Sequence, residues 1–365
     1  MSALEQLVAN GLHDPLAAAR SHAQQGGRVI GFFGAEIPVE LIVACGAFPL
    51  RLPSAALPRF DSADRYLESS FMPESRSIAE QYLQGAFNFL DSMILPRSND
   101  SAQRLYYYLS ELRSRELRTA PIPLIYDLAK IARASSKEHS RAATQRLAAE
   151  IRVVADALSG AIEQRNRRRR LFFKAAQMRR GAAGPLGSQM DRMFRAADFC
   201  DADTFDQAMS EWLRAAECTR TKARVLLVGS APPDERLHRA VEQAGGNIVA
   251  ESDAHASSAV SQPEISANGS IDAISDHYYA LLNSTRAFMD RAKVIRTLAL
   301  EAQVDGVIIW LIEEEDALIW DLPAELSALQ ASGIRTLHLT RRLWDVDDGT
   351  QQEIRQFIRS LEGPS

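Results

Sequence analysis

Cysteine is scarce in this sequence, and the common motifs of metal and nucleotide sites are missing. The 365 residues include three cysteines, Cys45, Cys200 and Cys218, which lie far apart and form no CxxC pair. They do not make a disulfide framework, so we expect them to be small buried or half-buried side chains. The seven histidines show neither HxxxH nor HExxH spacing. The sequence also lacks GxxxxGK[ST] and any GxGxxG after a strand, and Ser230 lacks the GxSxG context of a serine hydrolase.

Long apolar runs and a strong net charge are absent as well. No apolar run approaches the ~18 residues that suggest a membrane span, and the start, MSALEQLVANGLHD, lacks the basic flank and apolar core of a signal peptide. A net charge of −5 implies no general attraction to nucleic acid or anionic membranes. The composition, 46% hydrophobic and 24% charged, is ordinary for a globular protein. We expect a cytoplasmic protein with room for two domains and with neither a nucleic-acid nor a membrane partner.

The stretch RVIGFFGAEIPVELIVACGAFPLRLP predicts a strand, a turn, a helix and a second strand. Arg28–Phe32 is a short apolar run typical of a buried strand. Gly34 allows a sharp turn, and Pro38 suits the first turn of a helix. Val39–Ala47 has apolar residues at helical spacing, and Pro49–Leu52 returns to an extended pattern. This order indicates the opening of a parallel α/β sheet.

The rest of the chain repeats this plan. Strands are predicted at SMIL and Ile122–Tyr126 in the first half, and at RVLLV, NIVA, DGVIIWL and IRTLHL in the second. The region between the halves shows no strand pattern, and a long helix is predicted over 276–303 behind a polar, mobile loop at 253–275. The fold class is therefore α/β, with two Rossmann-like (flavodoxin-like) parallel-sheet domains joined by a helical segment. The predicted units are N-terminal helices at 1–24, a first α/β domain at 25–134, a helical segment at 135–222 and a second α/β domain at 223–365.

Ligands of such sheets bind at the carboxyl ends of the strands. Gly34 and Glu36, in the turn after the first strand, are therefore candidate pocket residues. Ser230, in the corresponding turn of the second half, is another.

A series of motifs gives the chain a family resemblance. "P-x-E-L-I" and "G-A-x-P-x-R-L" are matched by PVELI and GAFPLRL, and the segments FNFLDSMILPRSNDSAQRLY, VLLVGSAPPDERLHRAVEQAGG and VDGVIIWLIEEEDALIWDLP follow in the same order. Asn166 and Arg169 fit an "N-x-x-R" between the two halves. Together these motifs resemble the 2-hydroxyacyl-CoA dehydratase and benzoyl-CoA reductase family over nearly the whole chain.

The resemblance implies cluster positions that lack cysteine here. Cluster-bearing subunits of this family supply three cysteines to a [4Fe–4S] cluster, and their places fall on Met72, Asn99 and Glu315. A thioether, an amide and a carboxylate do not reproduce three thiolates. We therefore expect no cofactor in this chain, and a pocket that persists without its cluster. Simpler interpretations stay open: Asn99 as a helix cap, Met72 as an apolar filler, and Glu315 as part of a solvated acidic loop.

A basic run follows Asn166. Arg167–Arg170 includes four consecutive arginines, which cannot all face one way on a helix, since successive residues turn about 100°. Arg169 is the candidate for binding coenzyme A phosphates, because it fits the motif. The simpler interpretation is a solvated helix face whose other arginines pair with acids such as Glu163.

Three functions are compatible with these observations. The first is a cluster-free subunit of a dehydratase-like or reductase-like complex acting on acyl-CoA thioesters, in a heterodimer with a cluster-bearing paralogue or a homodimer, and not catalytic alone. The second is a redox-inactive protein that binds an acyl-CoA or a small acid. The third is acid–base chemistry by Glu315 and Asp316, whose pKa values a shared pocket could separate.

Overall fold

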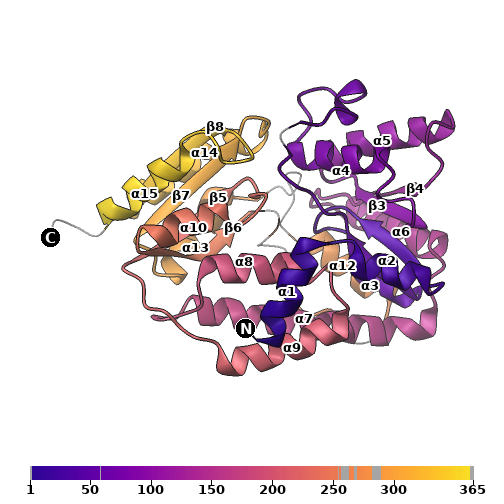
Figure 1. Ribbon diagram of the computed structural model, residues 1–365, viewed down its shortest axis with the longest axis horizontal. Helices are drawn as coiled ribbons and strands as arrows, with labels where there is room; N and C mark the ends of the chain where they lie inside the picture. Colours follow the sequence, from indigo (N-terminus) through magenta and orange to yellow (C-terminus); the bar gives the residue numbers. More distant parts are fainter. Residues whose placement is uncertain are drawn as a thin grey trace.

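Two parallel sheets form the frame of the molecule in the computed structural model (Figure 1). The structure describes residues 2–57, 59–253, 255, 263–266, 269–281 and 289–361. The first sheet has the order β2-β1-β3-β4 and the second the order β6-β5-β7-β8, and every strand pair is parallel. The predicted α/β fold with two Rossmann-like domains is confirmed. Within the described part of the chain, no helix has both the length and the apolar character needed to cross a membrane.

The first sheet buries apolar strands between two helical layers. Ile30 and Ile94 face one apolar core, whereas Val29 and Met93 face the other, as the two-residue period of a strand requires. The elements of this domain are β1 (Arg28–Phe32), α3 (Val39–Ala44), β2 (Ala47–Arg51), α4 (Pro73–Leu83), β3 (Ser92–Pro96), α5 (Asp100–Ser114) and β4 (Ile122–Tyr126). The predicted strands and their order in the chain agree with these bounds.

The second sheet repeats the arrangement. Its central strand β7 is buried along its whole length, as expected for a parallel strand covered on both faces. The elements are β5 (Ala223–Gly229), α10 (Arg236–Gln243), β6 (Gly246–Ser252), α13 (Arg291–Glu301), β7 (Gly306–Ile312), α14 (Leu322–Ala331), β8 (Arg335–Arg342) and α15 (Thr350–Leu361).

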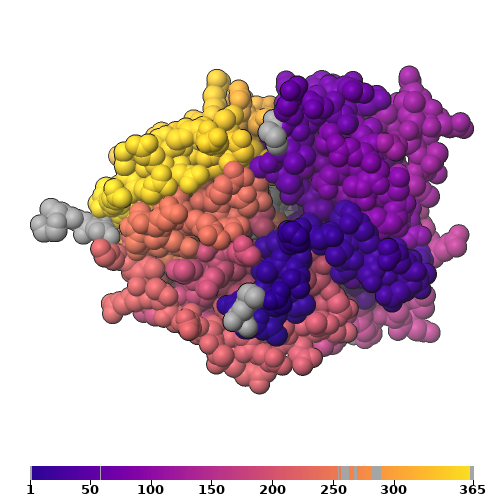
Figure 2. All heavy atoms as spheres, in the orientation of Figure 1, coloured from indigo at the N-terminus to yellow at the C-terminus, as the bar shows by residue number. Residues whose placement is uncertain are grey.

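Helices between the sheets join the two halves. This segment consists of α6 (Ala134–Glu150), α7 (Leu158–Arg179), α8 (Gly187–Ala196) and α9 (Ala202–Ala215). Figure 1 shows α7 and α9 running below both sheets. The N-terminal helices α1 (Ala3–His13) and α2 (Ala17–Gln24) lie on the outside, with α1 packed on α8 and α9, as the indigo spheres of Figure 2 show.

The expected long helix over 276–303 is wrong. The chain forms α12 (Ile271–Ala280) and then α13, and α12 packs against α6 of the first half. Ile274 and Tyr278 enter the same apolar core as Ile30 of the first sheet. A segment from the second half of the sequence thus returns to the first domain. Part of the predicted mobile loop, at 254, 256–262 and 267–268, lies outside the described residues.

Candidate functional site

A cavity of about 1270 Å³ lies where the two sheets face each other. In each sheet the strand order reverses between the first and third strands, β1/β3 and β5/β7. Loops leaving the carboxyl ends of these strands diverge there and leave a crevice, the usual ligand position in open α/β sheets. Residues of both sheets, of α7 and α8, and of α12 and α13 line the cavity.

The turns that border the cavity depend on glycine. Gly34 has φ +69° and Gly229 has φ +119°, conformations that L side chains rarely adopt. A Cβ on Gly229 would lie 2.2 Å from the Trp310 carbonyl oxygen. Ser230, which follows, is buried: its backbone N–H donates to that oxygen and its Oγ accepts from the N–H of Ile312. Ser230 is thus held against β7 at the cavity floor.

The cavity brings together most of the residues proposed from sequence. Its wall includes Gly34, Glu36, Met72, Asn99, Ser230 and Glu315. Arg169 is not in this wall. It borders a separate hollow of about 40 Å³, with Arg165, Arg168 and Asp198.

Each of the three positions expected to have lost cysteine has a local role. Asn99 is the N-cap of α5, and its Oδ1 accepts from the N–H of Ala102 at 2.8 Å. Met72 is half-buried and packs on the apolar core of the second sheet. Glu315 is half-buried rather than solvated, and its Oε1 accepts from the N–H groups of Ala317 and Leu318. Burial raises the pKa of Glu315, and these two bonds offset part of the rise.

Glu36 contacts residues that follow two other strands of the first sheet. Its carboxylate accepts from Ser98 Oγ and lies 3.1 Å from Lys130 Nζ. Lys130 Nζ also donates to the carbonyls of Tyr278 and Leu281, at 2.6 and 2.5 Å. This buried lysine therefore fixes α12 to the first domain. Burial lowers the pKa of Lys130, and the nearby Glu36 carboxylate offsets part of that decrease.

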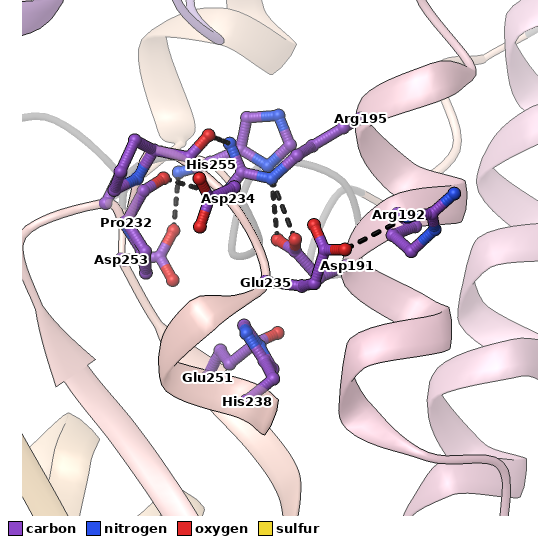
Figure 3. A network of polar contacts seen from close by, with 12 residues as sticks. Asp191, Arg192, Arg195, Pro232, Asp234, Glu235, His238, Glu251, Asp253 and His255 are labelled. Atoms are coloured by element: carbon purple, nitrogen blue, oxygen red, sulfur yellow. Dashed lines mark hydrogen bonds and ion pairs between the residues drawn. The ribbon is translucent and has the colours of Figure 1, made fainter. Parts of the chain in front are cut away.

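Cations in the wall are largely paired (Figure 3). Arg195 of α8 donates to Asp191 and to the Pro232 carbonyl, at 2.8 and 2.7 Å, and so connects α8 to the turn after β5. Arg192 pairs with Glu235 at 3.0 Å. These contacts hold two guanidiniums in place beside the cavity and leave them little capacity for a ligand.

A buried triad closes the wall between α7 and β6. Glu251 accepts from Arg179 at 3.0 Å and contacts His238 Nε2. Burial raises the pKa of Glu251, but the two cationic partners outweigh it and hold the pKa well below its ordinary value. The pKa of His238 is raised by Glu251, against the effect of burial.

Arg180, Glu74 and His277 are among the described cavity groups whose side chains have no hydrogen-bond or ion-pair partner. Glu74 lies in the first turn of α4, and burial raises its pKa against Arg51 and Arg195. His277 is 8% exposed, and burial and Arg169 lower its pKa to about 4, so it is neutral near pH 7. These are the groups that a ligand could satisfy.

The basic run is mostly internal. Arg169 donates to Glu40 and to Asn166, and Tyr278 donates to the same Glu40 at 2.9 Å. Burial raises the pKa of Glu40, but Arg169 and Arg165 outweigh it and lower the pKa overall.

Arg168 and Arg170, the neighbours of Arg169 on α7, differ in burial. Arg168 is also buried, on Asp206 and two carbonyls, so the expectation of a solvated face is wrong for these two arginines. Arg170 is partly exposed and pairs with Glu163, as predicted.

Comparison with known proteins agrees with this architecture. The profile of the family described as "2-hydroxyglutaryl-CoA dehydratase, D-component" matches residues 35–361. The chain belongs to this family. A relative from Escherichia coli (strain K12), described as "Putative dehydratase subunit YjiM", is 23% identical, with the match covering 78% of each chain.

The side chains present do not fit the iron–sulfur cluster that the resemblance implied for cluster-bearing members of the dehydratase family. Such a cluster is held by thiolates. None of the three cysteines lines the cavity: Cys45 is buried beside α3, Cys200 is half-buried near α1, and Cys218 is exposed. Asn99 and Glu315, moreover, already bond backbone N–H groups.

Sequence reasoning missed several residues of the site. Glu74 follows Met72 by two positions, and Pro73 at a helix start was the signal available for it. His255, in the polar stretch at 253–275, is half-buried in the cavity wall. The sequence around Lys130 and His277 does not indicate that they belong to the site, because their positions depend on how α12 packs back onto the first domain.

Proposed function

We propose that this chain is the cluster-free subunit of a dehydratase-type complex and that it binds an acyl-CoA thioester in the cavity between its two sheets. The observation that carries the proposal is the cavity itself. It lies at the strand-order reversals of both sheets, and it is lined by Met72, Asn99 and Glu315, where the resemblance places the cluster cysteines of the family. Its wall has no thiol among the described residues.

The size of the cavity supports a large ligand. Pockets for drug-sized molecules span roughly 300–1,000 Å³, and this one measures about 1270 Å³. A thioester with its coenzyme needs such a volume, whereas a small acid alone would leave most of it empty.

The chemistry of the wall supports binding rather than redox catalysis by this chain. Its carboxylates and guanidiniums are mostly paired, and no side chain in the described wall can supply a thiolate to iron. The redox step would then belong to a partner subunit that carries the cluster. The chain would contribute the substrate pocket and the subunit interface.

Two measurements test this function. The native complex, isolated untagged, should contain a second subunit by mass spectrometry, and iron and acid-labile sulfide should be found in the complex but not in this chain alone. Stoichiometric iron and sulfide in the isolated chain would contradict the proposal. A stable homodimer that binds a thioester without turnover would favour the redox-inactive binding protein instead.

A matched pair of variants tests the site. Ala231 lines the cavity, whereas Ala149 is exposed on α6 and does not. Calorimetry should show acyl-CoA binding to the wild type and to Ala149→Trp, and none to Ala231→Trp. Equal binding by both variants would place the thioester elsewhere.

A further inference from the structure

One part of the cavity wall, here the arm, is formed by residues of α7 and α13. Phe173, Ala176, Gln177 and Arg180 line it from the side of α7. Their spacing of i, i+3, i+4 and i+7 places all four on one face of the helix. This face is not used by any residue assigned above to the pocket or to the cluster positions.

Arg180 directly follows the last residue of α7, Arg179. Arg224 donates to the carbonyls of Arg180 and Ala302, at 2.8 Å each, so the C-terminal ends of α7 and α13 meet there. Glu301 of α13 also borders the cavity and attracts Arg180, but no ion pair within 4.0 Å forms in the described structure.

The guanidinium of Arg180 is left without a partner. Its Nε is buried and makes no hydrogen bond to the described residues. The preceding Arg179, in contrast, is paired with Glu251 at 3.0 Å. A half-buried guanidinium whose donors are unused and which faces a cavity is suited to a bidentate anion such as phosphate.

Phe173 supplies a flat apolar surface to the same arm. Phe173 is 55% exposed although it borders the cavity, and Val294 of α13, also in the wall, is 39% exposed. Arg180 follows Phe173 by seven positions, a rise of roughly 10 Å along the helix axis. An aromatic ring and a guanidinium on one face at this spacing can contact the base and the phosphate of a single nucleotide, the ring by stacking and the guanidinium by charge.

We propose that the α7 face of Phe173 and Arg180 is a nucleoside-phosphate subsite. The nucleotide is either the adenosine phosphate end of coenzyme A or a free adenine nucleotide such as ADP. In the first case the inference rests on the proposed function, and in the second it stands without it.

The test compares three probes: CoA, ADP, and the pantetheine thioester, which lacks the nucleotide. Calorimetry should show that Arg180→Ala weakens the binding of CoA and of ADP by about 10-fold to 100-fold, and that Phe173→Ala weakens both by about 5-fold or more. Arg180→Lys should recover only part of the affinity, because an ammonium cannot form the bidentate contact. Binding of the pantetheine thioester should be unchanged in all of these variants.

Lys174 is the matched control. It is adjacent to Phe173 and is also a cation, but it is exposed and outside the cavity wall. Lys174→Ala should change each affinity by less than about 2-fold, and unchanged thermal midpoints should show that all variants fold.

Equal effects of Arg180→Ala and Lys174→Ala would overturn the subsite. Wild-type binding of ADP without any acyl-CoA binding would support the subsite and contradict the proposed function. Binding of the pantetheine thioester, with no effect of Arg180→Ala on CoA binding, would support the proposed function and contradict the subsite.

Discussion

Replacing Arg169 should destabilise the protein more than it impairs ligand binding. The Glu40 carboxylate is fully buried and accepts from Arg169 and from Tyr278. Arg169→Ala removes the ion-paired cation, so the buried charge of Glu40 keeps only the Tyr278 hydroxyl and the weaker attraction of Arg165. Breaking a buried pair by deleting one partner costs about 3–5 kcal/mol. With a urea dependence of about 3 kcal/mol per molar, the unfolding midpoint should fall by roughly 1–1.7 M.

The control lies next to it on the helix. Arg170 pairs with Glu163 and Glu264, but its side chain is 41% exposed. Pairs of this kind contribute about 0–1 kcal/mol, so Arg170→Ala should shift the midpoint little. Both variants are measured by urea unfolding, followed by tryptophan fluorescence.

The pH dependence gives a second readout of the same pair. In the wild type the pKa of Glu40 is lowered, so its contribution to stability is present above its unfolded value of 4.5 and is lost as the pH falls. Without Arg169 the balance shifts towards burial, so the pKa of Glu40 rises and protonation relieves the buried charge. The difference between wild type and Arg169→Ala should therefore narrow from pH 7 to pH 5, and adding Glu40→Gln should recover part of the loss. An Arg169→Ala midpoint as high as that of Arg170→Ala, with acyl-CoA binding ten-fold weaker, would refute this structural role and favour phosphate binding.

Other predictions concern single side chains. His277 has a pKa of about 4 in the folded protein against 6.5 unfolded, so its contribution to stability is complete above pH 6.5 and is lost as the pH falls. In urea unfolding, the wild type should therefore lose roughly 2 kcal/mol more of its free energy of unfolding than His277→Gln between pH 7 and pH 5. Asn99→Ala should cost about 1 kcal/mol by removing a helix cap, and Asn99→Ser much less; equal midpoints for the two would contradict the capping role. Gly229→Ala should destabilise by more than 1 kcal/mol, because its Cβ would meet the Trp310 carbonyl. Gly160→Ala, on an open helix face, should instead raise the thermal midpoint slightly, so a loss for both would argue against the local clash.

The fold was predictable because its signals are local. Short apolar runs such as RVIGF and SMILP, each followed by a turn and a helical pattern, indicate parallel strands without any tertiary information. The site was partly predictable for the same reason. Carboxyl ends of parallel strands converge, so Glu36, Asn99, Ser230 and Glu315, each soon after a strand, fall on one cavity.

Helix boundaries within the second half were harder to predict from the sequence. The pattern over 276–303 is helical on both sides of a break, and apolar periodicity alone does not reveal that α12 and α13 pack on different domains. The direction in which a helix leaves a domain depends on what it can bury, and Ile274 and Tyr278 find their core more than 200 residues earlier in the chain, against Ile30.

Charge pairing was decided by the tertiary structure alone. The run Arg167–Arg170 shows that arginines surround a helix, but not which of them are neutralised. Arg169 finds Glu40, 129 residues away, whereas Arg180, at the end of the same helix, finds no partner among the described residues. Local sequence specifies which backbone elements form, because periodicity and turn chemistry act over a few residues. Whether a charged side chain is a structural pair or an unused donor depends on groups brought close by folding, and that proximity leaves no pattern in the neighbouring sequence.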